Sequence, residues 1–143
     1  MPQYTPLETT KVVTVSGVNQ KEVFNRCRQW FSEYFVSGES VVDYEDAQVG
    51  TVIGKGVGKI GSDPLGIIAY HIRYTIRIDT KDGRMKITTK ILNHTNNDGQ
   101  RAPYDVNYIP QSRNDKAVRH MAEIVSEIER YVTTTRGDSS SSW

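Results

Sequence analysis

The most constraining feature of the sequence is a long alternation of apolar and polar residues that a tight turn divides in two. Isoleucine and tyrosine alternate with polar residues over 67–79, and a similar alternation follows over 84–92, after the pair Asp82-Gly83. Strict alternation is typical of a half-buried strand, and Asp-Gly between two such strands predicts a hairpin. We therefore expect the isoleucine and tyrosine face to be buried and the opposite face to stay in water.

Three shorter segments also have the composition of strands. Residues 11–16 are rich in β-branched residues, residues 40–45 alternate, and residues 51–60 are rich in glycine. Within 40–45, the alternation predicts that Val42 and Tyr44 share one face. Together with the hairpin, these segments give five strands.

Two segments carry the period of amphipathic helices. Asn19 is a good N-cap for the first helix, which ends at Ser37-Gly38, and Ser112 is the capping residue of a second helix over about 113–133. Their apolar stripes can cover one face of an antiparallel sheet. The stripes consist of Val23, Cys27, Trp30 and Tyr34 in the first helix and of Ala117, Met121, Ile124, Ile128 and Tyr131 in the second.

These elements predict one α+β domain with a five-stranded, mainly antiparallel sheet and two helices on one face, in the order β-α-β-β-β-β-α. A chain of 143 residues leaves little room for a second domain. We expect residues 1–10 to form a flexible N-terminal arm, residues 11–133 the domain and residues 134–143 a disordered, serine-rich tail. Residues 93–112 lack a clear period, but alternating Tyr104, Val106 and Tyr108 indicate a short extra strand or a packed loop.

The stretch from Lys11 to Leu92 resembles a known family. The resemblance is carried by the valine-rich first strand, Val-Phe-Asn-Arg and Trp-Phe within 23–31, Val-Asp-Tyr-Glu-Asp at 42–46, Gly50 with Ile-Gly-Lys-Gly at 53–56, and the Ile-Asp-Thr-Lys-Asp-Gly-Arg hairpin at 78–84. The sequence is similar to a bacterial domain of unknown function, typical of Bacteroidota, that is described as having a TATA-box-binding-protein-like (TBP-like) fold. The resemblance implies the strand and helix order given above, and it implies no activity.

The composition excludes several classes of protein. Eighteen Lys and Arg against seventeen Asp and Glu give a net charge of +1, so no bulk charge drives the chain onto nucleic acid or membrane. No apolar run is long enough for a transmembrane helix. A single cysteine, Cys27, excludes an internal disulfide and a multi-cysteine metal site. The sequence as given starts without a secretory signal, so we expect a cytoplasmic or virion location, or a periplasmic or secreted one if a leader has been removed.

The polar face of the predicted hairpin concentrates positive charge. Only Asp79 opposes the basic residues there, and a local basic patch can attract polyanions. Against nucleic acid, the tyrosines of this hairpin alternate to the buried side, and the face offers neither aromatic stacking platforms nor apolar wedges. The candidate binding residues are His71, Arg73, Arg77, Arg84, Lys86 and Lys90.

Three glycines of the segment 51–60, Gly54, Gly56 and Gly58, lie two residues apart and so share one face of a strand. Bare backbone allows a helix or a partner chain to approach closely, so we interpret this face as a close-packing or interface surface. The Gly-Lys pairs of the segment are not followed by Ser or Thr, so the phosphate-binding P-loop pattern fails.

No catalytic or metal-binding arrangement is evident. The three histidines have no metal-ligand spacing, and the acidic cluster of Asp43, Glu45 and Asp46 lacks the spacing of a calcium loop, so cross-strand pairing with Lys55 or Lys59 is expected instead. Cys27 lies on an apolar stripe and is predicted to be buried. We therefore expect no cofactor, no metal and no enzyme activity.

The sequence favours a non-catalytic binding or assembly module that contacts a protein partner or associates with itself. One alternative is a domain that binds polyanions or nucleic acid through the basic face of the sheet. Another is a structural component of a phage particle or of the cell envelope. The sequence identifies no ligand, partner or oligomeric state.

Overall fold

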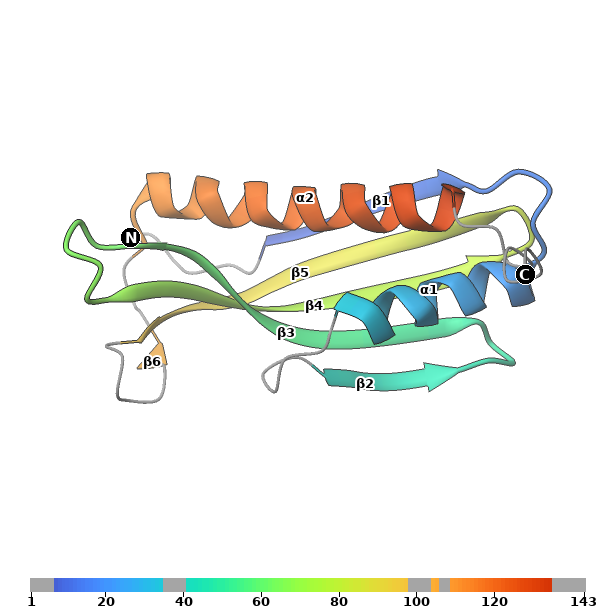
Figure 1. The fold of residues 1–143 in the computed structure, drawn as a ribbon, viewed down its shortest axis with the longest axis horizontal. Helices are drawn as coiled ribbons and strands as arrows, with labels where there is room; N and C mark the ends of the chain where they lie inside the picture. Colours follow the sequence, from blue (N-terminus) through green and yellow to red (C-terminus); the bar gives the residue numbers. More distant parts are fainter. Residues whose placement is uncertain (1–6, 35–40, 98–103, 106–108, 135–143) are drawn as a thin grey trace, which may run out of the picture.

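The computed structural model describes residues 7–34, 41–97, 104–105 and 109–134 of the chain. It confirms the predicted α+β fold, with two helices packed on one face of an antiparallel sheet (Figure 1). The elements are β1 (Leu7–Thr14), α1 (Gln20–Tyr34), β2 (Val41–Asp46), β3 (Thr51–Ser62), β4 (Ala69–Lys81), β5 (Arg84–Asn97), β6 (Tyr104–Asp105) and α2 (Gln111–Thr134).

The five main strands lie in the order β1-β5-β4-β3-β2, and every neighbouring pair is antiparallel. The predicted hairpin forms the centre of the sheet, with Lys81 opposite Arg84 at its turn. Gly83 has a φ of 75°, a left-handed conformation that glycine adopts without steric cost. The two-residue strand β6 pairs with Thr95 and Asn96 of β5, beyond the residues that pair with β1.

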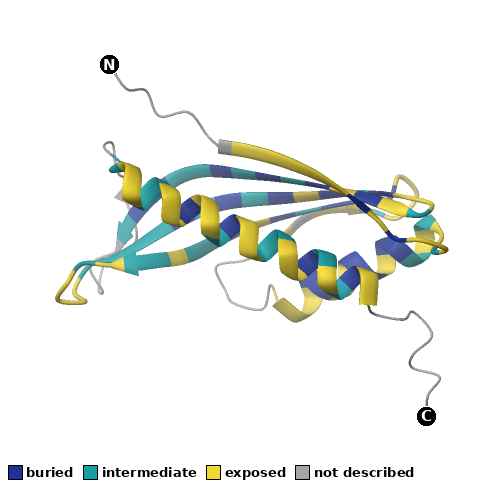
Figure 2. Ribbon diagram, turned by 90° about the horizontal axis from the view of Figure 1, so that it is seen from above, coloured by how far each residue is buried: buried dark blue, intermediate teal, exposed yellow. Residues whose placement is uncertain are grey.

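One hydrophobic core lies between the helices and the sheet (Figure 2). The sheet contributes the isoleucine side of the predicted alternation, including Ile72, Ile76 and Ile78 of β4, all fully buried. Burying a large aliphatic side chain stabilises the fold by roughly 1.5–3 kcal/mol, so this face accounts for much of the stability. The helices contribute Val23, Phe24, Cys27, Trp30, Phe31, Ala117, Met121, Ile128 and Val132.

The first helix begins as predicted, because Asn19 Oδ1 accepts a hydrogen bond of 2.9 Å from the backbone N–H of Glu22. The second helix begins earlier than predicted. Ser112 lies inside α2 and is not its N-cap, since the helix starts at Gln111 and the carbonyl of Pro110 accepts the N–H groups of Arg113 and Asn114. Neither of these helices is long and apolar enough to cross a membrane.

The predicted N-terminal arm is too long. β1 begins at Leu7, and residues 7–10 pair with Thr88–Ile91 of β5. The Oγ1 atoms of Thr9 and Thr89 are 2.7 Å apart, so pairing with β5 holds this polar segment in the sheet. The sequence of the segment alone does not indicate this pairing. At the other end, Thr134 belongs to α2 rather than to the predicted tail. Residues 1–6 of the predicted arm and 135–143 of the predicted tail lie outside the described residues.

The register of the sheet shifts at three places, and the shifts in β2 and β5 change predictions made from the sequence. The register of β2 shifts between Val42 and Tyr44, so the prediction that these two residues share a face is wrong. Tyr44 instead lies on the face away from the helices, opposite Ile53. In β5 the register shifts at Leu92, and the strand continues to Asn97 through part of the segment for which no period was evident.

Candidate binding site on the open sheet face

The surface of the sheet away from the helices, here called the open face, carries three pairs of cations. Residues that are directly opposite in neighbouring strands point to the same face, so the register places each pair. Within each strand the two cations are four residues apart, or about 13 Å. The pairs are Lys55 and Lys59 on β3, Arg73 and Arg77 on β4, and Lys86 and Lys90 on β5.

The structure places all of the predicted binding residues on this face and adds two that were missed. Lys55 and Lys59 alternate with Gly54, Gly56 and Gly58, so they point away from the helices. This alternation could have revealed them, but the prediction considered only the two strands of the central hairpin. Among the side chains that the structure describes, the acidic residues of the open face are Glu8, Asp46 and Asp79.

The two ends of the open face differ in accessibility. His71 is half-buried with an inaccessible Nδ1, and it lies opposite Thr95, which is only 1% exposed. The end near the β4–β5 turn is open to solvent, and Arg77, Lys81, Arg84 and Lys86 are all exposed there. This second end is therefore the accessible part of the predicted basic surface.

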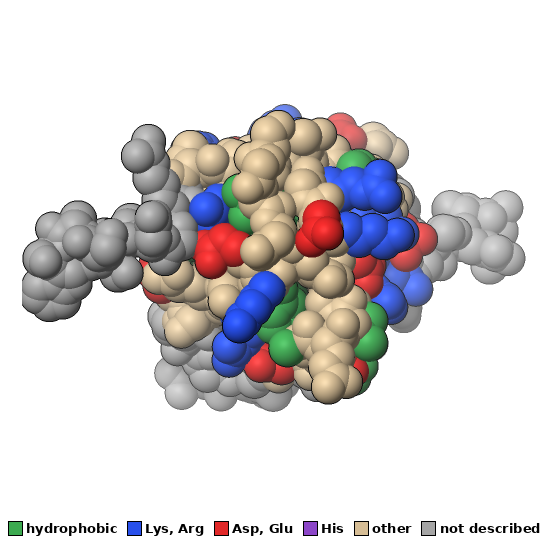
Figure 3. Space-filling model, turned by 90° about the vertical axis from the view of Figure 1, so that its right-hand side faces the viewer, with side chains coloured by type: hydrophobic (Ala, Val, Ile, Leu, Met, Phe, Trp, Pro, Cys, Tyr) green, Lys and Arg blue, Asp and Glu red, His purple; other side chains and the backbone are tan. Residues whose placement is uncertain are grey.

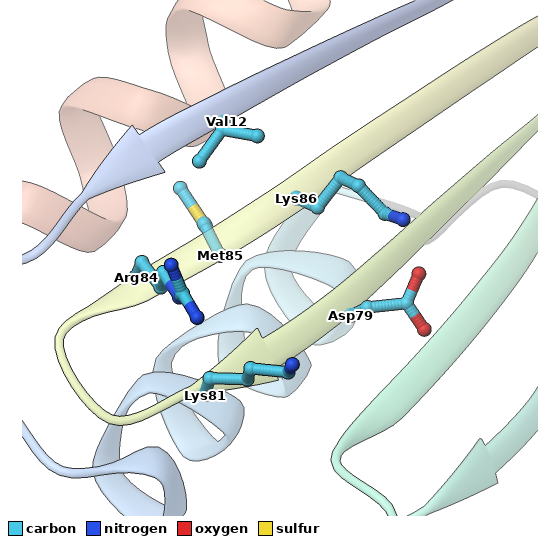
Figure 4. A pocket seen from close by; sticks show the side chains of 6 residues that line it. All are labelled: Val12, Asp79, Lys81, Arg84, Met85 and Lys86. Atoms are coloured by element: carbon cyan, nitrogen blue, oxygen red, sulfur yellow. The ribbon is translucent and has the colours of Figure 1, made fainter.

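A hollow of about 180 Å³ lies on the open face beside the β4–β5 turn (Figure 4). This volume is enough for a carboxylate or a similar small group. Lys81, Arg84 and Lys86 surround it with one acidic residue, and Val12 adds an exposed aliphatic side chain. Its lining consists of Val12, Asp79, Lys81, Arg84, Met85 and Lys86.

Asp79 is held in its charged form at the edge of the hollow. Burial alone would raise the pKa of Asp79, but hydrogen bonds from Arg77 and Thr51 and the charges of Arg77 and Lys86 outweigh burial and lower the pKa. Arg77 Nε donates to both carboxylate oxygens at 3.2 and 3.1 Å, and Thr51 Oγ1 donates at 2.7 Å. Because Arg77 compensates Asp79, the hollow has a net positive charge from its three other cations.

The glycine surface is filled from within the chain. Gly54, Gly56 and Gly58 face the helices, which agrees with the predicted close approach of a helix. A Cβ atom at Gly56 would lie 2.7 Å from Tyr74 Oη, and one at Gly58 would lie 2.5 Å from His120 Nε2 of α2. These glycines thus admit a side chain and a helix of the same chain, so they do not form an exposed interface with another chain.

The remaining candidates for chemistry are engaged in the fold. Burial raises the pKa of the Cys27 thiol to about 12, and its Sγ lies 3.8 Å from Met85 Sδ. Glu45 pairs with Arg28 of α1 at 2.9 Å, rather than with the lysines of β3, and Asp46 Oδ1 accepts N–H groups of the β2–β3 turn. Among the described residues no three His, Cys, Asp or Glu side chains are arranged to hold a metal ion.

Comparison with known proteins agrees with this fold. Residues 10–95 match the family model described as "Domain of unknown function (DUF4468) with TBP-like fold". The chain belongs to the DUF4468 family. The predicted resemblance to a bacterial domain of unknown function is therefore confirmed.

Two solved structures show the same fold as this DUF4468 domain. A TBP-like protein from Parabacteroides distasonis matches with a TM-score of 0.70 and 14% identity over 94% of this chain and 98% of that one. A DUF4468 family protein from Bacteroides ovatus matches with a TM-score of 0.65 and 14% identity over 95% of this chain and 91% of that one. No curated protein matches the sequence. At this level of identity the similarity establishes the fold alone.

Proposed function

We propose that this domain is a non-catalytic binding module whose open face binds an acidic segment of another protein. The observation that carries the proposal is the charge of that face, where the described basic side chains outnumber the described carboxylates by eight to three. The basic residues are Lys55, Lys59, Arg73, Arg77, Lys81, Arg84, Lys86 and Lys90. Complementary charge accelerates association and selects the partner.

The aromatic residues favour an acidic polypeptide over nucleic acid. Single-stranded nucleic acids stack their bases on several aromatic side chains. On the described part of the open face the aromatic side chain is that of Tyr44, at the β2 edge, apart from the half-buried His71. Acidic side chains need no stacking platform.

The hollow beside the β4–β5 turn suits a glutamate side chain. Arg84, Lys81 and Lys86 can bind a carboxylate, and Val12 can contact the methylene groups that precede it. The hollow therefore provides a specific contact for one glutamate side chain, whereas the rest of the open face attracts an acidic segment through its charge alone.

The proposal is tested by fluorescence anisotropy with a labelled oligoglutamate peptide. The double variant Lys86→Glu and Lys90→Glu should weaken binding about tenfold or more, since it reverses two charges on the open face. The matched control Lys21→Glu and Arg130→Glu changes the net charge equally on exposed positions of the helices, and it should bind like the unmodified protein.

Three outcomes contradict the proposal. The unmodified protein could fail to bind the peptide even at low salt, where exposed charges attract most strongly. The two double variants could lose binding equally, which would reduce the effect to net charge. Tighter binding of single-stranded or duplex DNA than of the peptide would assign the face to nucleic acid.

A further inference from the structure

The β3–β4 turn presents two large aliphatic side chains to water. Leu65 is 80% exposed and Ile67 is 61% exposed. Because β4 is antiparallel to both β3 and β5, this turn lies at the opposite end of the molecule from the hollow (Figure 1). Residues 63–68, here called the hairpin tip, are thus separate from the surface of the proposed function.

Hydrogen bonds hold the hairpin tip in one shape. The N–H of Asp63 donates to the carbonyl of Ile68 at 3.0 Å, and the N–H of Gly66 donates to the carbonyl of Asp63 at 2.9 Å. The N–H of Ile68 also donates to Asp63 Oδ1 at 2.9 Å. Gly66 adopts a φ of 74°. The turn therefore presents Leu65 and Ile67 in a fixed arrangement, which limits the entropy lost when they bind a partner.

An aromatic ring and basic side chains lie behind the tip. Tyr70 follows Ile67 by three residues, or about 10 Å along an extended chain, and the Arg113 guanidinium carbon lies 3.7 Å from the centroid of its ring. Lys116 Nζ lies 3.6 Å from the position of a Cβ on Gly61, so its ammonium group is beside the same hairpin. Apolar residues at a tip with tyrosine and basic residues behind them match the layers of a bilayer surface.

Basic side chains slightly outnumber acidic ones among the described residues of this end, with Lys59, Arg113, Lys116 and Arg119 against Asp63, Asp115 and Glu123. Lys116 and Arg119 of α2 line a groove of about 240 Å³ beside β3 that holds one carboxylate, that of Glu123. Lys59 also borders this groove, because it lies beyond the residues of β3 that pair with β2. Of the other carboxylates near the tip, Asp63 accepts a hydrogen bond within the turn and Asp115 accepts one from Gln111, and both keep their negative charge because the donors are neutral amides. The opposite end of the molecule shows acidic and basic side chains intermixed (Figure 3).

We propose that the hairpin tip inserts into the surface of an anionic lipid bilayer. Leu65 and Ile67 enter the acyl region, Tyr70 lies at the headgroup level, and Arg113, Lys116 and Arg119 of α2 contact the lipid phosphates. A flat anionic surface engages the tip and the basic residues at once, whereas an apolar groove on a protein would use the tip alone. Two inserted side chains give weak and reversible attachment.

The test is co-sedimentation with lipid vesicles made of equal parts phosphatidylcholine and phosphatidylglycerol. The tip variant Leu65→Ser with Ile67→Ser should lower the bound fraction about fivefold or more, because it removes the inserted apolar surface. The matched control Val49→Ser removes a side chain that is 60% exposed in the β2–β3 turn, and it should bind like the unmodified protein. Vesicles of phosphatidylcholine alone should bind less protein.

A charge-reversal pair separates this site from the open face. Arg113→Glu with Lys116→Glu, both on α2, should weaken vesicle binding, whereas Lys86→Glu with Lys90→Glu should leave it largely intact and should weaken only oligoglutamate binding. The inference is overturned if the unmodified protein does not sediment with anionic vesicles, or if the tip variant sediments as well as the control. It is also overturned if only the Lys86 and Lys90 variant loses the vesicles.

Discussion

The ring of Tyr74 lies against the backbone of Gly56, its partner across β3 and β4, so closely that a Cβ atom at Gly56 would be 2.7 Å from Oη and 2.8 Å from Cζ. Tyr74 is 5% exposed, so its ring cannot turn into solvent. Gly56→Ala should therefore lower the free energy of unfolding by about 1–3 kcal/mol through overpacking, as measured by urea denaturation. In a Tyr74→Leu background, Gly56→Ala should lower the free energy of unfolding by less. An equal loss in both backgrounds would show that contact with the Tyr74 ring is not the cause.

Arg26 joins the two helices as a buried cation. It is 8% exposed, its Nη1 donates to the carbonyl of Val132 at 2.8 Å, and its Nε donates to Glu22 at 3.0 Å. The last carbonyls of a helix lack partners within the helix, and a cation there is favourable. Arg26→Met should lower the free energy of unfolding by about 1.5–3 kcal/mol.

Arg28 provides the matched control for Arg26. It pairs with Glu45 at 2.9 Å, but both side chains are largely exposed to solvent. Arg28→Met should therefore cost less than about 1 kcal/mol in the same denaturation experiment. If Arg26→Met and Arg28→Met lower the free energy of unfolding equally, burial of the Arg26 hydrogen bonds adds nothing to the stability of the fold.

The central hairpin and the two helices could be predicted because their sequence periods are strong and local. Met85, Ile87 and Ile91 are buried while Arg84 and Lys86 are exposed, as the alternation requires. The first helix follows from its N-cap and its apolar stripe. These signals also place the basic residues of β4 and β5 on one face, because successive side chains of a strand point to opposite faces and the apolar ones occupy the buried face.

The remaining features depend on pairing between distant residues. The bulge at Leu92 reverses the alternation, so His94 is buried in a run of polar residues that predicts no strand. The first four residues of β1 have no apolar period of their own and are ordered by β5. The sequence also fails to indicate the exposed pair at the hairpin tip, because Ile67 continues the apolar composition of the strand that follows it.

His94 should make the stability of the domain depend on pH. Its side chain is 1% exposed, and its Nε2 lies 3.4 Å from Asn114 Oδ1. Burial lowers the pKa of His94 below its ordinary 6.5, against the opposing effect of the Asn114 hydrogen bond, and the charge of Arg113 lowers it further. The unfolded chain then takes up a proton at a higher pH than the folded one.

The free energy of unfolding should consequently be constant between about pH 7 and pH 8 and should fall as the pH drops below 6.5. Burial lowers the pKa of His120 as well, so this residue contributes in the same direction. Urea denaturation at a series of pH values should show a smaller fall for His94→Leu than for the unmodified protein. If the free energy of unfolding falls equally with pH in the unmodified protein, His94→Leu and His120→Leu, these two histidines are not the cause of the pH dependence. Asp79 cannot replace them, since its pKa lies below 3.8.

The thiol of Cys27 reports on the opening of the core. Burial raises its pKa to about 12, so at pH 8 roughly one molecule in ten thousand carries the reactive thiolate even before access is considered. Labelling by a disulfide reagent should therefore be slow in buffer and fast in concentrated urea. Val132→Ala removes part of a fully buried side chain of α2 and should accelerate labelling, whereas Val118→Ala, at an exposed position of the same helix, should not. Rapid labelling of the unmodified protein in buffer would show that α1 separates from the sheet without global unfolding.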